Sequence, residues 1–178
     1  IGGIKIRSAS PTLNELSINN NSMGFFGSGG GIYSYNSSSL ITNTIISENS
    51  CGDYGEDQGG GLYLSFSSPK LFNTAIINNM SWTEIGGGIY NTSSNPVIVN
   101  CIIAENYGSE LFNNSGEVHL SYSAVFNDPE FGTELGVIGL DPSVGLISTV
   151  NENGDSCDTH NNIFLDPQLI EYDGNVYY

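Results

Sequence analysis

A five-residue block, three glycines followed by an aliphatic residue and tyrosine, recurs along this chain and limits its fold more than any other feature. It occurs at 29–33, 59–63 and 86–90, and a degenerate copy, Gly-Gly-Ile-Lys, opens the chain at 2–5. The second-last glycines are residues 2, 30, 60 and 87, so the steps are 28, 30 and 27 residues. Such a period indicates a repeat architecture, in which each unit buries its apolar face against the next.

The same steps align a second set of segments without gaps. Two apolar columns follow, as the inward positions of stacked strands require. An asparagine column follows the second of them, where asparagine tolerates a left-handed backbone and its amide can bond to the copies above and below. A second asparagine ladder of the same kind is possible for Asn43, Asn73 and Asn100. The three columns are Leu13, Ile41, Leu71 and Ile98; Ile18, Ile46, Ile76 and Ile103; and Asn21, Asn49, Asn79 and Asn106.

Short strands and glycine- and asparagine-rich turns at this period leave few all-β architectures. A leucine-rich repeat has its own leucine spacing, and a propeller blade needs ~40 residues. The remaining fit is a parallel β-helix (β-solenoid) of ~28-residue coils, in which each coil forms three short strands that pair with the coils before and after. The glycine triplet then marks a tight corner, where a Cβ would collide with the neighbouring coil.

We expect one β-helix domain over 1–178. The repeat predicts regular coils over 1–106 and looser terminal coils over 107–178, with one long loop excursion. The chain begins without methionine and inside a predicted strand, so we expect it to be part of something longer or a subunit that stacks end to end. The unpaired edge of the first coil would then be covered by another coil of the same polypeptide or by another subunit.

The charge balance excludes several partners. Three basic residues stand against 19 acidic ones, which gives a formal charge of -16. Binding to a phosphate backbone would work against this field, so we expect no nucleic acid partner. No apolar run approaches the ~20 residues that cross a bilayer, so we expect no membrane insertion.

The segment Asn95–Ile103, together with the flanking glycine blocks, resembles the right-handed β-helix repeats of large secreted bacterial surface proteins. These include the polymorphic outer-membrane protein type and giant proteins with C-terminal sorting domains. The segments 120–123 and 162–167 are similar to the closing coils of that group. A Ser-Pro and Asp-Ala-Gly stretch that usually follows in the group is missing after Tyr178. The resemblance implies a right-handed single-stranded coil, an extracellular or cell-surface location, and a structural or adhesive role.

Aromatic residues mark two candidate binding surfaces for a partner or a glycan. Insertions of unequal length fall at one corner of each coil, so we expect these loops to emerge on one side. They carry Phe25, Phe26, Tyr54 and Trp82. Tyr33, Tyr63 and Tyr90 align with Lys5 in an outward column, which either stabilises adjacent coils by cross-strand contact or forms a platform for sugars.

An enzyme is the main alternative, because many polysaccharide lyases and hydrolases are parallel β-helices. A lyase needs a cation or metal beside the uronate carboxylate and a base next to it, but Arg7 and Lys70 fall in different columns and coils. A hydrolase needs two carboxylates ~5 to 9.5 Å apart, and the regular strands carry only Glu15. We therefore predict a protein without catalytic residues, with a lyase-like or glycan-binding β-helix as the alternative.

Calcium is the one cofactor that the sequence leaves open. Asp53, Glu56 and Asp57 share a loop and offer oxygen ligands, although their spacing matches no known calcium loop and a solvated acidic loop is the simpler interpretation. His119 and His160 have no second ligand at metal spacing. Cys101 aligns with Thr44 and Thr74, which predicts a buried small side chain. A disulfide between Cys51 and Cys157 is one pairing that the sequence allows.

Overall fold

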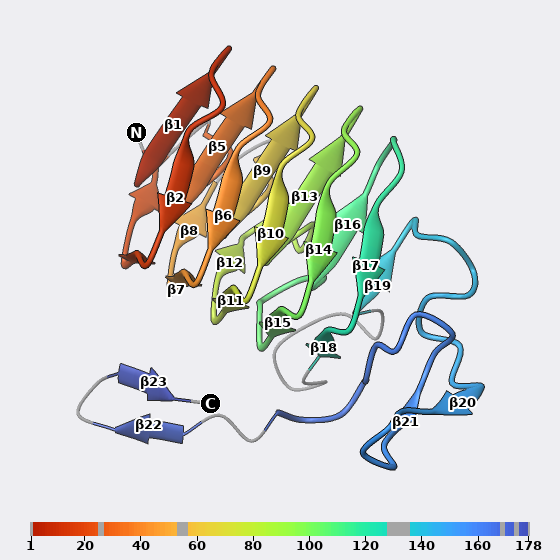
Figure 1. The fold of residues 1–178 in the computed structure, drawn as a ribbon. Helices are drawn as coiled ribbons and strands as arrows, with labels where there is room; N and C mark the ends of the chain where they lie inside the picture. The colour runs from red at the N-terminus through yellow and green to blue at the C-terminus, as the bar shows by residue number, and fades with distance from the viewer. Residues whose placement is uncertain are drawn as a thin grey trace.

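The computed structural model describes residues 2–24, 27–52, 57–127, 136–167, 170–172 and 175–177, the last two ranges by their backbone alone. Its strands stack in parallel along one axis, coil after coil, and an irregular C-terminal part folds back against the last coils (Figure 1). The described residues contain no helix. The predicted parallel β-solenoid is therefore confirmed.

Five coils contribute one strand each to three parallel sheets, the first sheet gains a sixth strand, and three coils add a two-residue strand at a corner. The first sheet contains β1 (Ile4–Arg7), β5 (Ile32–Tyr35), β9 (Leu62–Ser65), β13 (Ile89–Thr92), β16 (Leu111–Asn113) and β19 (Val137–Ile138). The second contains β2 (Thr12–Asn14), β6 (Leu40–Thr42), β10 (Lys70–Phe72), β14 (Val97–Val99) and β17 (His119–Ser121). The third contains β3 (Ser17–Asn19), β7 (Ile45–Ser47), β11 (Ala75–Ile77), β15 (Ile102–Ala104) and β18 (Ala124–Phe126). The corner sheet contains β4 (Ser22–Met23), β8 (Ser50–Cys51) and β12 (Met80–Ser81).

The strand register follows the sequence repeat. Ile4 pairs with Ile32, Ile32 with Leu62, and Leu62 with Ile89, which reproduces the steps of the glycine blocks. Pairing continues beyond residue 106, because Ile89 pairs with Leu111. That coil is only 22 residues long and adds no strand to the corner sheet. Shortening at one corner leaves the three sheets continuous to Phe126.

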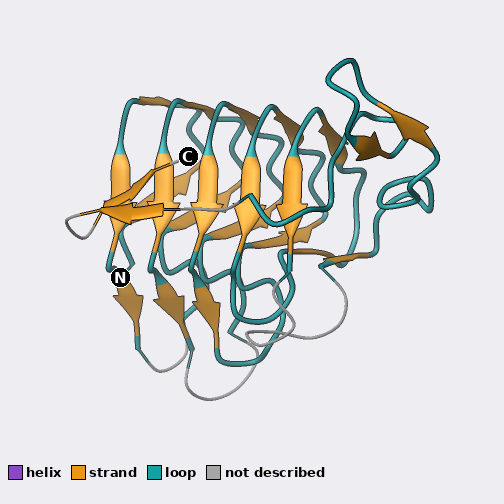
Figure 2. Cartoon of the chain, turned by 90° about the horizontal axis from the view of Figure 1, so that it is seen from below, coloured by secondary structure: helices purple, strands orange, loops and turns teal. Residues whose placement is uncertain are grey.

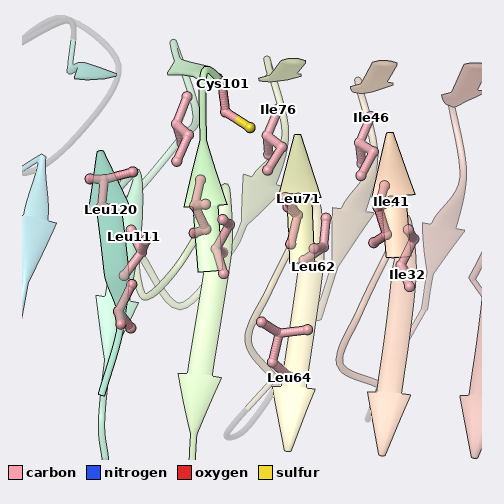
Figure 3. Packing of buried hydrophobic residues seen from close by; sticks show 14 of the residues in the cluster. Ile32, Ile41, Ile46, Leu62, Leu64, Leu71, Ile76, Cys101, Leu111 and Leu120 are labelled. Atoms are coloured by element: carbon pink, nitrogen blue, oxygen red, sulfur yellow. The ribbon is translucent and has the colours of Figure 1, made fainter. Parts of the chain in front are cut away.

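The core fills the inside of the coil with aliphatic columns (Figure 3). Ile41, Leu71 and Ile98 from the second sheet are essentially inaccessible to solvent, as are Ile46, Ile76 and Ile103 from the third. These are the two apolar columns that the sequence predicts. They meet the first sheet's inward column in one cluster. That column contains Ile32, Leu62, Ile89 and Leu111.

The glycine triplets form the corner that leads into the first sheet, and they are required there for two reasons. Gly59 has a φ of +76°, a conformation that residues with a side chain rarely adopt. A Cβ on Gly60 would lie 2.4 Å from the Met80 carbonyl oxygen and 2.6 Å from that of Gly87. The coils therefore approach each other too closely at this corner for any side chain.

The predicted asparagine column is a hydrogen-bonded ladder inside the coil, which we call the inner ladder (Asn21, Asn49, Asn79 and Asn106). The Oδ1 of Asn79 accepts from both the backbone N and the Nδ2 of Asn49, at 3.0 and 2.9 Å. Its Nδ2 donates to Ile46 O and to Asn106 Oδ1, both at 2.9 Å. The left-handed backbone that was expected in this column lies one residue earlier, at Asn20, Glu48, Asn78 and Glu105. That shift turns the asparagine side chain inward, so its amide replaces water as the partner of buried backbone groups.

Two hydroxyl ladders stabilise the other corners in a similar way. Ser67 Oγ accepts from the backbone N of Ser37, and Ser94 Oγ accepts from that of Ser67. In the other ladder, Thr44 and Thr74 each donate to the carbonyl oxygen two residues earlier. Cys101 takes the next place with its Sγ 3.3 Å from Val99 O, which confirms it as a buried threonine replacement.

An outer ladder (Asn14, Asn43, Asn73 and Asn100) runs along the surface between the second and third sheets. Asn43 donates to Asn14, Asn73 to Asn43, and Asn100 to Asn73, at 3.0, 3.2 and 2.7 Å between Nδ2 and Oδ1. The backbone is left-handed at Asn43, Asn73 and Asn100. This second ladder was open from the sequence and is now confirmed.

After Phe126 the described chain returns as an excursion packed beside the last coils (Figure 2). Its short antiparallel pair, β20 (Thr149–Val150) with β21 (Ser156–Cys157), precedes a segment in which Ile163 bridges to Ala124. A hairpin of β22 (Ile170–Tyr172) and β23 (Asn175–Tyr177) ends the described chain. Cys51, Cys101 and Cys157 are all buried and free, so the disulfide between Cys51 and Cys157 is not formed.

Candidate functional sites

The corner loops were predicted to carry binding aromatics. The stacking of β4, β8 and β12 brings the loop-bearing corners of three coils to one side of the molecule (Figure 2). Trp82 directly follows β12, and 58% of its surface is exposed. Phe25, Phe26 and Tyr54 lie outside the described residues. Trp82 is thus the member of this group that the structure places, and it is available to a partner.

The predicted calcium ligands belong to the chain segment between β8 and β9. Asp53 and Glu56 lie outside the described residues, whereas the Asp57 carboxyl is buried and its Oδ2 has no hydrogen-bond partner among the described atoms. The backbone oxygen of Asp57 accepts from the hydroxyls of Ser81 and Thr83. The described part of the chain holds no group of three or more His, Cys, Asp or Glu suited to a metal ion. Calcium binding therefore stays a prediction.

Cys51 lies beside Asp57 in this corner and is not poised for chemistry. Burial, assisted by the negative charge of Asp57, raises the pKa of its thiol to about 12. A thiol with such a pKa stays protonated at physiological pH, and only the thiolate attacks or binds metal.

The tyrosine column is a continuous aromatic stack on the outer side of the first sheet. Ring centroids are 5.2 Å apart for Tyr33 and Tyr63 and 5.4 Å apart for Tyr63 and Tyr90, with interplanar angles of 7° and 6°. Phe112 extends the stack at 5.6 Å, and the Lys5 ammonium lies 5.3 Å from the Tyr33 centroid at the other end. Phe112 was not predicted to belong to this column, because its coil is shorter than the repeat.

This geometry favours the structural interpretation of the column. A sugar platform needs an exposed ring face, but in the stack each inner ring turns both faces toward its neighbours. Tyr90 is buried, and burial is also the main reason why the pKa of Tyr63 is raised. We conclude that the stack braces the coils, at roughly 0.2 to 1 kcal/mol per aromatic pair.

The excursion and the last coils enclose a cleft that the sequence did not reveal. Its volume is about 620 Å³, within the range of small-ligand sites. One wall is the end of the outer ladder with Asn100, Tyr122 and Asn161, and the other is the turn of residues 151–155. We call it the Tyr122 cleft.

A second cleft of about 590 Å³ contains both histidines of the chain, and we call it the histidine cleft. Ser143 Oγ lies 2.9 Å from His160 Nε2 and donates to Asp141 Oδ1 at 2.5 Å. The hydrogen bonds of Ser143 hold the pKa of Asp141 below its usual range, so the carboxylate is ionised and only accepts. Since the hydroxyl proton points to Asp141, His160 must donate to Ser143. A nucleophilic serine requires the opposite direction, with histidine accepting that proton.

Comparison with known proteins identifies the repeat region. The family model described as "Right handed beta helix region" matches residues 2–164. No curated protein and no solved structure gives a match to this chain. In the part of the chain that the structure describes, no helix has the length and apolarity to cross a membrane.

Proposed function

Because the chain belongs to the right-handed β-helix family, we propose that it is a rigid extracellular scaffold of a bacterial surface protein, of the polymorphic outer-membrane or sorting-domain-bearing kind. Its exposed loops and clefts mediate adhesion or assembly at the cell surface. The alternative is a carbohydrate-active β-helix of lyase-like or glycan-binding type, and the Tyr122 cleft is an observation that favours a carbohydrate ligand under either proposal.

The observation that carries the scaffold proposal is the use of polar side chains to join coils. Ladders of asparagine and serine bond successive coils in the described structure, and the ladders that contain Asn79 and Ser67 do so through buried groups. Thr44 adds a bond between coils by accepting from the backbone N of Leu16. Buried hydrogen bonds that are fully satisfied specify a unique and rigid packing. Rigidity over several coils is what a stalk needs, and it positions whatever the surface displays.

The cations of the chain are also used in ways that favour a structural role. Lys5 lies over the Tyr33 ring, and the Arg7 guanidinium lies 5.2 Å from the Tyr35 centroid. Lys70 is on β10, in a different sheet. A uronate lyase needs a cation beside a base, and these three do not gather around one substrate site. We therefore expect no lyase activity.

An absorbance assay separates the scaffold from the lyase. The chain is incubated with polygalacturonate and with other acidic polysaccharides, and the formation of unsaturated uronate is followed with a known lyase as the positive control. We expect no increase above the protein-free rate. An increase that scales with protein concentration would establish the carbohydrate-active alternative instead.

Charge separation along the axis supports end-to-end assembly. On the first coil Lys5 and Arg7 outnumber the exposed Glu15, whereas the exposed acidic residues Glu117, Asp141 and Glu152 lie at the opposite end. Attraction between such ends weakens with salt, because the Debye length falls from about 10 Å at 0.1 M to 3 Å at 1 M. We expect sedimentation to show larger species at low salt and high concentration, and negative-stain images to show rods. A monomer at every concentration and low salt would contradict stacking.

A further inference from the structure

The outer ladder ends in a residue that does not fit it. At the place that follows Asn100, one coil later, the chain has Tyr122, with its backbone still left-handed at a φ of +51°. Asn161 takes the place after that and is left-handed as well. Asparagine and glycine adopt this conformation readily, but for a bulky residue it is an outlier.

The tyrosine also leaves the exposed Oδ1 of Asn100 without a donor from the next coil. Earlier in the ladder each Oδ1 accepts from the amide of the next coil. Tyr122 has no amide to offer, and among the described residues no group donates to Asn100 Oδ1. The Tyr122 side chain is 63% exposed and lines the same cleft as Asn100. An aromatic surface and a free amide oxygen therefore face one cavity.

The opposite wall is rigid and polar. Asn151 Oδ1 accepts from the backbone N of Asn153 and of Asp155, both at 2.9 Å, and its Nδ2 donates to Asp155 Oδ2 at 3.0 Å. The strand pair β20–β21 holds both ends of this turn. The turn presents Glu152 and Asp155 to the cleft, and no Lys, Arg or His is among its described lining residues.

We propose that the Tyr122 cleft binds an uncharged glycan, recognised by the exposed tyrosine ring together with the amide and carboxylate oxygens around it. The apolar face of a pyranose packs on an aromatic ring, and its hydroxyls donate to carboxylate and amide oxygens and accept from amide N–H groups. Two carboxylates and a chain of formal charge -16 disfavour an acidic polysaccharide. The site gives the proposed adhesive role a ligand class, and it rests on that proposal for its biological setting alone.

Phe66 provides a matched control for Tyr122. It also has a left-handed backbone, with a φ of +48°, and 61% of its surface is exposed. It follows β9 at another corner and is not among the residues of the cleft. Tyr122→Asn and Phe66→Asn each replace an exposed left-handed aromatic with the residue that suits the backbone, so both variants are expected to fold.

The test uses an array of uncharged and acidic glycans, followed by calorimetric titration with the uncharged glycan that binds most strongly. We expect uncharged glycans to be retained, Tyr122→Asn to weaken binding by about tenfold or more, and Phe66→Asn to bind like the parent chain. Circular dichroism and thermal unfolding confirm that both variants are folded. The proposal is overturned if no uncharged glycan binds, if acidic glycans bind best, or if Tyr122→Asn keeps full affinity. A failure of glycan binding does not bear on the scaffold proposal, which the sedimentation and lyase measurements test separately.

Discussion

Two rows of asparagine run along the same coils, one buried and one exposed. Their hydrogen bonds show how the same side chain contributes differently in the two environments. Inner-ladder residues such as Asn79 have no solvent access and bond both to each other and to the backbone of neighbouring coils. The outer-ladder residue Asn73 is exposed, and the described structure gives its side chain hydrogen bonds to Asn43 and Asn100 alone. The same side chain is therefore structural in one row and replaceable in the other.

Each ladder also ends differently. Asn106 closes the inner ladder on the carboxyl group of Glu110, donating its backbone N to Oε1 at 3.1 Å and its Nδ2 to Oε2. Glu110 has no solvent access, so burial raises the pKa of its carboxyl to about 8. The outer ladder ends on Tyr122, at the cleft proposed to bind glycans. The buried end holds a carboxyl group whose charged form is disfavoured by burial, and the exposed end lies at the proposed binding surface.

The largest effect is expected from Glu110 as pH changes. The unfolded chain releases this proton near pH 4.5, whereas the folded chain retains it to about pH 8. The stabilisation is therefore complete below pH 4.5 and is lost as pH rises to about 8, by up to about 4 to 5 kcal/mol for this group. Urea unfolding of the parent chain and of Glu110→Gln between pH 4 and 9 measures the difference.

The Gln variant should show a smaller decrease of stability over that pH range, because its side chain does not titrate. It should also be less stable than the parent chain at low pH, since its amide N–H₂ faces a donor of Asn106. Parallel pH curves for the two proteins would show that Glu110 is not the group responsible.

Removing one inner-ladder side chain is expected to lower the free energy of unfolding by nearly as much. Asn79→Ala deletes hydrogen bonds to Asn49, Ile46 and Asn106 and leaves buried partners unsatisfied. Each unsatisfied buried group costs about 1 to 3 kcal/mol, so we expect a loss of roughly 3 to 4 kcal/mol in the free energy of unfolding. The urea midpoint measures it. A change of less than about 1 kcal/mol would mean that the inner ladder adds little to stability.

The end of the outer ladder should respond in the opposite direction. Tyr122→Asn replaces a bulky residue at a left-handed backbone position with one that tolerates this conformation, and it provides an amide that can donate to Asn100. We expect stability to rise by about 1 kcal/mol, seen as a higher melting temperature. A substantial decrease would mean that Tyr122 packs as a structural residue, contrary to its exposure.

The smallest effect is expected within the outer ladder itself. Asn73→Gly keeps the left-handed backbone and removes two exposed side-chain hydrogen bonds, to Asn43 and Asn100. We expect a loss of less than about 1 kcal/mol. A loss as large as that of Asn79→Ala, measured under the same conditions, would remove the distinction between the two ladders.

The sequence predicts the regular coils well because their information is local and repeated. Glycine triplets at a corner, aliphatic columns and an asparagine column fix which residues lie above one another, as the pairing of Ile46 with Ile76 and of Ile76 with Ile103 confirms. The left-handed position was misplaced by one residue, since Glu48 and Glu105 adopt it without the composition that normally marks it.

The candidate site was harder to predict, because it depends on a contact outside the repeat. The 22-residue coil breaks the spacing that aligns Tyr122 with Asn100, although the Leu120 that precedes it could have restored the register. Nothing in the turn at 151–155 indicates which part of the coil it faces. Weighing the sugar-platform interpretation of Tyr33, Tyr63 and Tyr90 also required the orientations of the rings, which the sequence does not reveal.

Residue-level mapping of ligand contact tests most directly whether the regular coils are the scaffold and their C-terminal cleft the binding site. Nuclear magnetic resonance spectra of the isotopically labelled chain are recorded during titration with the uncharged glycan selected on the array. We predict shifts at Asn100, Tyr122 and Asn151, with the signals of Tyr33, Tyr63 and Tyr90 unchanged. Shifts that centre on the tyrosine stack and spare Tyr122 would contradict this prediction.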